Sequence, residues 1–129
     1  TACCYRLRTR SPPVWGLNSL LMRLLIEQGL VVLDSRSQHG HNPPMVVTEI
    51  FLQDPMMLCP PPTAALRPRQ ESELRQRLAT LTSLITEALA DSAQERKHVK
   101  VDLIRWMGDA MGAESRAAGG RAGGQSRIA

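Results

Sequence analysis

Few side chains in this sequence have the type and spacing that metal binding or catalysis requires. His39 and His41 flank a glycine and could supply two metal ligands, but no clear third or fourth ligand accompanies them. The cysteines show no Cys-x-x-Cys spacing, so a zinc site is not predicted. Ser35 and Ser37 are close to His39 in sequence only. We therefore predict no metal, no cofactor and no catalytic residue.

The glycine pairs also lack the context of a nucleotide-binding loop. Gly119-Gly120 and Gly123-Gly124 follow no predicted strand and open no predicted helix. The chain contains two Trp, one Tyr and one Phe in 129 residues, so an enclosed apolar pocket is hard to build. We expect that the protein is not an enzyme and that it has no small-molecule substrate.

The cysteines favour a reducing compartment. Cys3 and Cys4 are adjacent, which is too close for an ordinary disulfide between them, and Cys59 makes the total odd. An odd number argues against a disulfide scaffold. The acid-free, Arg-bearing start of the chain resembles the end of an organellar targeting segment, so the mitochondrion is one candidate location. The cytoplasm, the cytoskeleton and the cilium are the alternatives.

Positive charge is concentrated at the two ends of the chain. The net charge is +4, yet all twelve carboxylates lie between Glu27 and Glu114. Arginine-bearing ends of this kind can bind phosphate backbones, RNA included. The predicted nucleic-acid contacts are Arg6, Arg8, Arg10, Arg116, Arg121 and Arg127.

The longest helical pattern runs through residues 69–112. Apolar residues recur at steps of four and three from Leu74 to Ile85, which places them on one face of a helix. Ser92 followed by Glu95 fits a capping box and predicts that a second helix starts there. We predict a helical hairpin; a single bent helix is the alternative. The apolar face could form the core of this chain or a seam for a partner.

The preceding part of the chain predicts a short helix followed by two apolar runs. The helix ends at Gly29, and the runs 30–34 and 45–52 could pair as an antiparallel hairpin. Residues 45–52 could instead be helical. This order resembles the tail half of a winged-helix domain over residues 17–52, and the resemblance implies nucleic-acid binding.

Together these patterns predict a mainly α fold with extended proline-rich and basic tails. No run reaches the roughly 18 apolar residues of a membrane span. The predicted parts are an extended basic arm over 1–16, the short helix and hairpin over 17–52, a proline-rich connector over 53–68, the helical hairpin over 69–112 and a flexible tail over 113–129.

The short N-terminal helix is apolar around much of its circumference, so it needs cover on more than one side. We therefore expect a non-catalytic subunit of a large multi-protein assembly, which could be a ribonucleoprotein. The alternatives are a nucleic-acid-binding protein and an adaptor that binds one partner helix in a groove. The expected partner contacts are Trp15, Leu20, Leu21, Leu24, Leu25, Met56, Met57, Trp106, Met107 and Met111.

Overall fold

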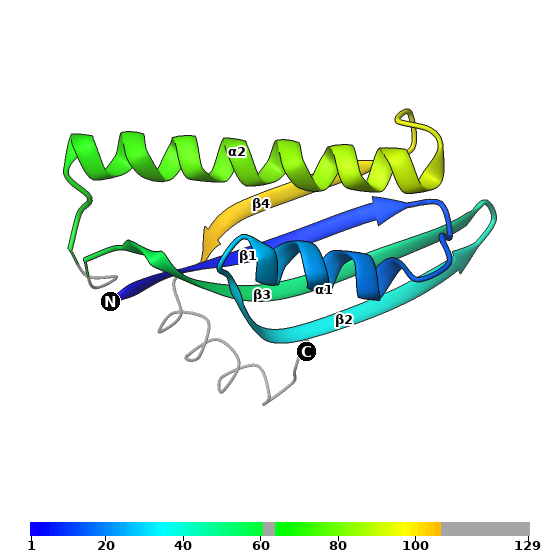
Figure 1. The fold of residues 1–129 in the computed structure, drawn as a ribbon, viewed down its shortest axis with the longest axis horizontal. Coiled ribbons are helices and arrows are strands. Elements are labelled where there is room, and N and C mark those ends of the chain that lie inside the picture. Colours follow the sequence, from blue (N-terminus) through cyan, green and yellow to red (C-terminus); the bar gives the residue numbers. More distant parts are fainter. Residues whose placement is uncertain (61–63, 107–129) are drawn as a thin grey trace.

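A four-stranded antiparallel sheet is the main feature of the computed structural model, which describes residues 1–60 and 64–106 (Figure 1). The elements in chain order are β1 (Ala2–Ser11), α1 (Leu17–Glu27), β2 (Val31–His41), β3 (Pro44–Leu58), α2 (Pro68–Ala93) and β4 (Lys100–Trp106). The strands lie in the order β2-β3-β1-β4. Strands hold 42% of the described residues and helices 36%, so the fold is α/β and the predicted mainly α class is wrong.

The segment predicted to be an extended basic arm is β1, a central strand of the sheet. Tyr5 and Leu7 are buried, whereas Arg6, Arg8 and Arg10 alternate with them on the opposite face. This period of two is the pattern of a half-buried strand. The prediction of an extended arm is wrong here because three arginines within five residues fit a solvated arm as well as the exposed face of a strand.

The predicted helical hairpin is wrong in its second half. The helical face begun at Leu74 belongs to one long helix, α2, which ends where Gln94 adopts a left-handed conformation with φ 56°. The Glu95 carboxylate caps no helix and instead accepts a hydrogen bond from the His98 backbone N–H at 3.2 Å. The chain then forms β4, in which Leu103 is buried against the helices.

The N-terminal helix and the hairpin are present. α1 is followed by Gly29, whose φ of 81° suits glycine. The predicted strand at residues 45–52 is confirmed and the helical alternative is wrong, because these residues form the middle of β3 and pair with β2. β3 also continues into the predicted proline-rich connector. Pro55 falls in the irregularity between the Cys3–Asp54 and Ala2–Leu58 pairs, where its missing N–H interrupts no pairing with β1.

Both helices pack on one face of the sheet and bury their apolar stripes there (Figure 1). α1 contributes Leu17, Leu21 and Leu25, which are all buried. α2 contributes Leu74, Leu81, Ile85, Leu89 and Ala90. Most of the apolar helix surface is therefore covered by this chain itself. The other face of the sheet has no helix over it within the described residues.

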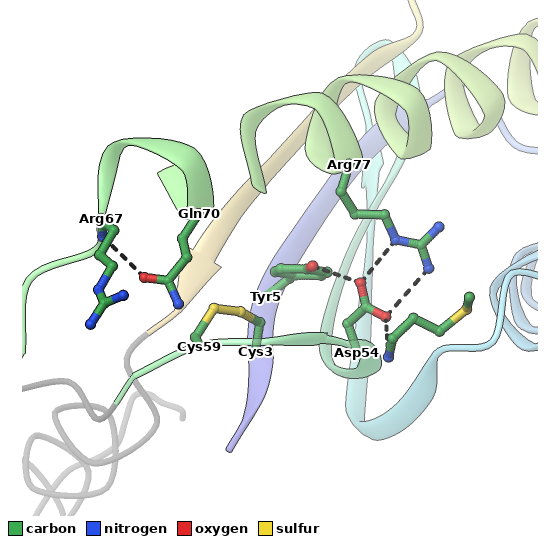
Figure 2. Close-up of a disulfide and its surroundings, with 8 residues drawn as sticks. Cys3, Tyr5, Asp54, Cys59, Arg67, Gln70 and Arg77 are labelled. Carbon is green, nitrogen blue, oxygen red and sulfur yellow. Dashed lines mark hydrogen bonds and ion pairs between the residues drawn. A yellow bond between two sulfur atoms is a disulfide. The ribbon is translucent and has the colours of Figure 1, made fainter. Parts of the chain in front are cut away.

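A disulfide joins the start of β1 to the segment after β3. Cys3 and Cys59 are bonded, with their Cα atoms 5.4 Å apart and a sequence separation of 56 residues (Figure 2). Cys4 is the free cysteine, and burial raises the pKa of its thiol. An odd number of cysteines therefore does not exclude a disulfide in this chain. The reducing compartment stays a prediction, and the cysteine count does not support it.

Removing the disulfide should destabilise the fold, since the bond shortens a long loop in the unfolded chain. We expect the Cys3→Ala/Cys59→Ala double variant to lose about 2–4 kcal/mol of unfolding free energy. Thermal unfolding followed by circular dichroism measures the loss, with Cys4→Ala as the matched control because Cys4 forms no disulfide. Equal melting temperatures for the double variant and the control would contradict this expectation.

Candidate functional site

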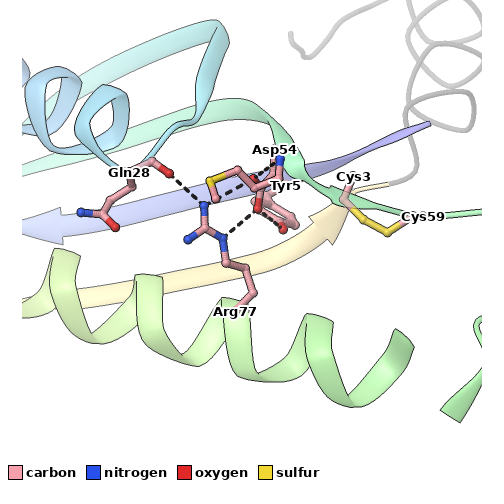
Figure 3. A network of polar contacts seen from close by, with 7 residues as sticks. Cys3, Tyr5, Gln28, Asp54, Cys59 and Arg77 are labelled. Carbon is pink, nitrogen blue, oxygen red and sulfur yellow. Dashed lines mark hydrogen bonds and ion pairs between the residues drawn. A yellow bond between two sulfur atoms is a disulfide. The ribbon is translucent and has the colours of Figure 1, made fainter. Parts of the chain in front are cut away.

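A buried polar cluster ties both central strands to both helices. The Tyr5 hydroxyl donates a hydrogen bond to Oδ2 of Asp54 at 2.7 Å. Arg77 on α2 donates from Nε to Oδ2 of Asp54 at 2.9 Å and from Nη2 to Oδ1 at 3.3 Å. The same Nη2 donates to the backbone carbonyl of Gln28 at 2.9 Å (Figure 3). Met56 donates its backbone N–H to Oδ1 of Asp54 at 3.1 Å.

The charges of this cluster compensate one another. Burial alone would raise the pKa of Asp54, but the hydrogen bonds from Arg77 and Tyr5 outweigh burial and hold that pKa below its usual value. The hydrogen bond to Asp54 raises the pKa of Arg77. Burial, followed by the Asp54 carboxylate, raises the pKa of Tyr5 well above its ordinary range. The cluster therefore holds an ionised Asp54–Arg77 pair and a neutral tyrosine at neutral pH.

This cluster is closed to ligands. Tyr5 and Asp54 have no exposed surface, and the Arg77 side chain keeps 19% of its own. Each oxygen of the Asp54 carboxylate accepts two hydrogen bonds, which leaves little capacity on the carboxylate for a ligand. The cluster therefore has a structural role: its ion pair and hydrogen bonds hold α2 against the sheet.

The open face of the sheet, by contrast, carries aromatic and cationic side chains that remain partly exposed. The Arg6 guanidinium lies 5.0 Å from the centroid of the Trp106 ring, a cation–π distance. Phe51 meets Trp106 edge to face, with centroids 5.5 Å apart and ring planes at 66°. These three residues come from β1, β4 and β3. We refer to Arg6, Phe51 and Trp106 as the aromatic platform.

Further cations continue along the same face. The Arg8 guanidinium pairs with the Glu49 carboxylate at 2.9 Å. Arg10 lies directly opposite Lys100 in the β1–β4 register. This end of the sheet holds an open depression of about 620 Å³, lined by Arg8, Thr9, Arg10, Val47, Lys100, Val101 and Asp102. Three of the seven lining residues, Arg8, Arg10 and Lys100, are cations and one, Asp102, is an acid.

The structure brings together the three predicted nucleic-acid contacts that it describes. Arg6, Arg8 and Arg10 occupy alternate positions of β1 and share the open face. The other three, Arg116, Arg121 and Arg127, lie outside the described residues. Sequence reasoning missed Phe51 and Lys100, although each sits in an alternating stretch that could have identified its face.

The predicted partner contacts are scattered. Trp15, at 101%, and Met56, at 71%, are strongly exposed, and Trp106 belongs to the aromatic platform. Leu21 and Leu25 have no exposed surface, so their side chains are not available to a partner. Leu20, Leu24 and Met57 are partly buried against the core of this chain. Met107 and Met111 lie outside the described residues.

The described part of the chain shows neither a metal-binding cluster nor a membrane-spanning helix. In residues 1–60 and 64–106, no group of three or more His, Cys, Asp and Glu side chains is placed to hold a metal ion. Neither α1 nor α2 combines the length and apolar character of a membrane-spanning helix.

The topology defines a known class of architecture. Since β1 and β2 both run antiparallel to β3, they are parallel to each other and form a βαβ unit with β3 between them. β3 and β4 form a second such unit around β1 by the same reasoning. This is the split βαβ arrangement of ferredoxin-like folds.

No protein-family model and no curated protein matches the sequence. Similar solved structures include a formyltetrahydrofolate deformylase from Pseudomonas putida KT2440, with a TM-score of 0.49 and 17% identity over 78% of this chain. An ACT domain protein from Streptococcus pneumoniae gives a TM-score of 0.46 and 10% identity over 81%. A dinuclear metal-binding peptidase of the M20 family from Bacillus subtilis gives 0.40 and 9% over 92%.

This chain spans 28% of the deformylase and 32% of the peptidase, against 91% of the ACT domain protein. With every TM-score below 0.5, these similarities support no conclusion about activity or ligands.

Breaking the buried cluster should destabilise the protein strongly at neutral pH. We expect Asp54→Asn to cost about 3 kcal/mol of unfolding free energy, because Arg77 would lose its buried counter-ion. The pKa of Asp54 is lowered in the folded state, so its contribution is complete above the ordinary value of 3.8. The contribution is lost as the pH falls through the lower folded pKa. The deficit of the variant should therefore shrink in acid.

Urea unfolding at pH 7 and at successively lower pH values measures this deficit. The matched control is Glu71→Gln, which breaks the exposed Arg75–Glu71 pair and should change stability by less than about 0.5 kcal/mol. A deficit for Asp54→Asn that grows below pH 3.8 would show that the sign of the pKa shift is wrong.

Proposed function

We propose that this chain is a non-catalytic module that binds single-stranded nucleic acid on the open face of its sheet. The observation that carries the proposal is the aromatic platform, in which Arg6, Phe51 and Trp106 from three adjacent strands lie side by side. Every nucleobase has a π-face, so a partly exposed ring and a stacked guanidinium can receive unpaired bases of any sequence.

The arrangement matches a general solution to RNA recognition. Four-stranded sheets that display aromatic side chains on an open face can stack two or three bases. Here the central strands β1 and β3 supply Arg6 and Phe51, and β4 supplies Trp106. Helices cover only the other face of the sheet within the described residues. A single strand could therefore lie across the platform without displacing a described helix or strand.

The charge of the open face supports an anionic ligand. By strand register, the cations on this face are Arg6, Arg8, Arg10, Arg36 and Lys100, and the acids are Asp34, Glu49 and Asp102. Five positive and three negative charges give a local excess of 5 − 3 = +2. The excess suits a phosphate backbone and predicts binding that weakens as salt concentration rises.

A second candidate function is docking onto a protein assembly. Trp15 is fully exposed in the loop between β1 and α1, and Ile26, Met56 and Leu58 are each more than 60% exposed. Large apolar side chains in such positions are candidates for burial by a partner. A module of a ribonucleoprotein could use these residues and the open face at the same time.

Binding should depend on the aromatic platform. We expect the full chain to bind a fluorescein-labelled, unstructured 12-nucleotide RNA, with an affinity that falls steeply with salt in anisotropy titrations. Phe51→Leu should weaken binding by roughly tenfold, since one stacked base contributes about 1–3 kcal/mol. Trp15→Leu removes an exposed aromatic outside the open face and should leave RNA affinity unchanged.

The melting temperature of each variant controls for folding. Absence of RNA binding at low salt, or equal affinity of the Phe51→Leu variant and the unaltered chain, would refute the proposed function. If the chain instead forms a stable dimer that protects Phe51 and Trp106 from solvent, the open face is a protein interface and the nucleic-acid proposal is wrong.

A further inference from the structure

Two cations face each other directly across neighbouring strands at one end of the open face. Arg10 on β1 and Lys100 on β4 are register partners, and both are exposed. Directly opposed residues of an antiparallel pair have Cβ atoms about 4.5–5.5 Å apart, and like charges at this spacing are destabilising. The two cations have no ion-pair partner among the described residues.

The neighbouring row of side chains is different. Arg8 is paired with Glu49 and lies opposite Asp102 in the strand register. Arg36 on β2 lies opposite Glu49, so this row holds two cations and two acids and has no net charge, unlike the row of Arg10 and Lys100. An anion on the open face is therefore directed away from the Arg8 row and toward Arg10 and Lys100.

We propose that Arg10 and Lys100 form a phosphate clamp, which holds one phosphate of a nucleic-acid strand whose bases stack on the aromatic platform. This inference rests on the proposed function and assigns the backbone contact within the same face. The open depression lined by both side chains provides the space. The Arg10 guanidinium can bind phosphate oxygens in a bidentate manner, and the Lys100 ammonium adds a point charge.

The separation of the two subsites sets a minimum length for the ligand. Arg10 lies four residues after Arg6 on β1, which corresponds to about 13 Å along the strand. That distance equals about four steps of a stacked nucleic-acid strand at 3.4 Å per nucleotide, and fewer steps of an extended strand. A mononucleotide cannot occupy both subsites, whereas an oligonucleotide of four or more residues can.

If the clamp exists, replacing both of its cations should weaken RNA binding without lowering the stability of the unliganded protein. We expect the Arg10→Gln/Lys100→Gln variant of the full chain to bind a labelled eight-nucleotide RNA about tenfold more weakly at 50 mM salt. The salt dependence should become shallower by about 0.7 in log–log slope, as expected for one lost phosphate contact on a single strand. The unliganded variant should melt at the same or a higher temperature, because a like-charge pair has been removed.

Arg23→Gln is the matched charge control. Arg23 is exposed on α1, so this substitution removes a positive charge that lies away from the open face. Its affinity should fall by less than twofold. The single variants Arg10→Gln and Lys100→Gln should each lose part of the effect. Affinity of the unaltered chain should rise clearly between one and four nucleotides.

The outcomes separate this inference from the proposed function. Suppose that RNA binds the unaltered chain and that Phe51→Leu weakens this binding. If the Arg10→Gln/Lys100→Gln variant then binds RNA as tightly as the unaltered chain, the clamp is refuted and the proposed function stands. If the double variant and Arg23→Gln lose affinity equally, only general charge acts and the clamp is again refuted. If no RNA binds the unaltered chain, the proposed function and the clamp fail together.

Discussion

The Asp54 carboxylate is the point at which the layers of this small fold are fastened to one another. It lies on a central strand and accepts hydrogen bonds from Tyr5 on the other central strand and from Arg77 on the longer helix. Arg77 also reaches the carbonyl of Gln28 at the end of the shorter helix. Removing either Asp54 or Arg77 would leave the other charge without its counter-ion. The two helices are thereby held in a fixed position over one face of the sheet.

Because both helices pack on one face of the sheet, no described helix covers the side chains of the other face. The strand alternation sends Tyr5 and Leu7 toward the helices and Arg6, Arg8 and Arg10 away from them. The rigid sheet then sets the spacing of its outward side chains through the strand register rather than through flexible loops. Such preorganisation lowers the entropy lost when a ligand binds. The open face is accordingly the part of the molecule best suited to recognition.

The helices were accessible from the sequence because their apolar residues repeat at 3.6-residue spacing. Leu74 and Leu81 lie in the buried stripe that this spacing predicted, and Gly29 follows the shorter helix as expected. The strands at the two ends were missed because charged residues obscured their period of two. For the stretch from Lys100 to Trp106, the capping signal at Ser92 and Glu95 predicted a helix and competed with the correct alternation.

Only part of the candidate site could be predicted from the sequence. Arg6, Arg8 and Arg10 were singled out for their charge, but nothing local indicated that Phe51 and Trp106 would meet beside them. These residues come from three separate strands, and only the order of the sheet brings them together. The buried cluster was equally hidden, since Tyr5 and Asp54 are 49 residues apart. The Cys3–Cys59 bond depends on the same long-range pairing.

The pairing of Cys4–Arg10 with Lys100–Trp106 places a constraint on how the chain acquires its structure. A central strand is completed only by a segment almost a hundred residues later, so the sheet cannot close while the polypeptide is still being synthesised up to that point. Contacts this remote in sequence slow folding, because the entropy of a large loop must be lost before they form. Until β4 is made, β1 can pair with β3 but its other edge lacks its partner, and such an unpaired strand edge makes nascent chains candidates for protection by chaperones.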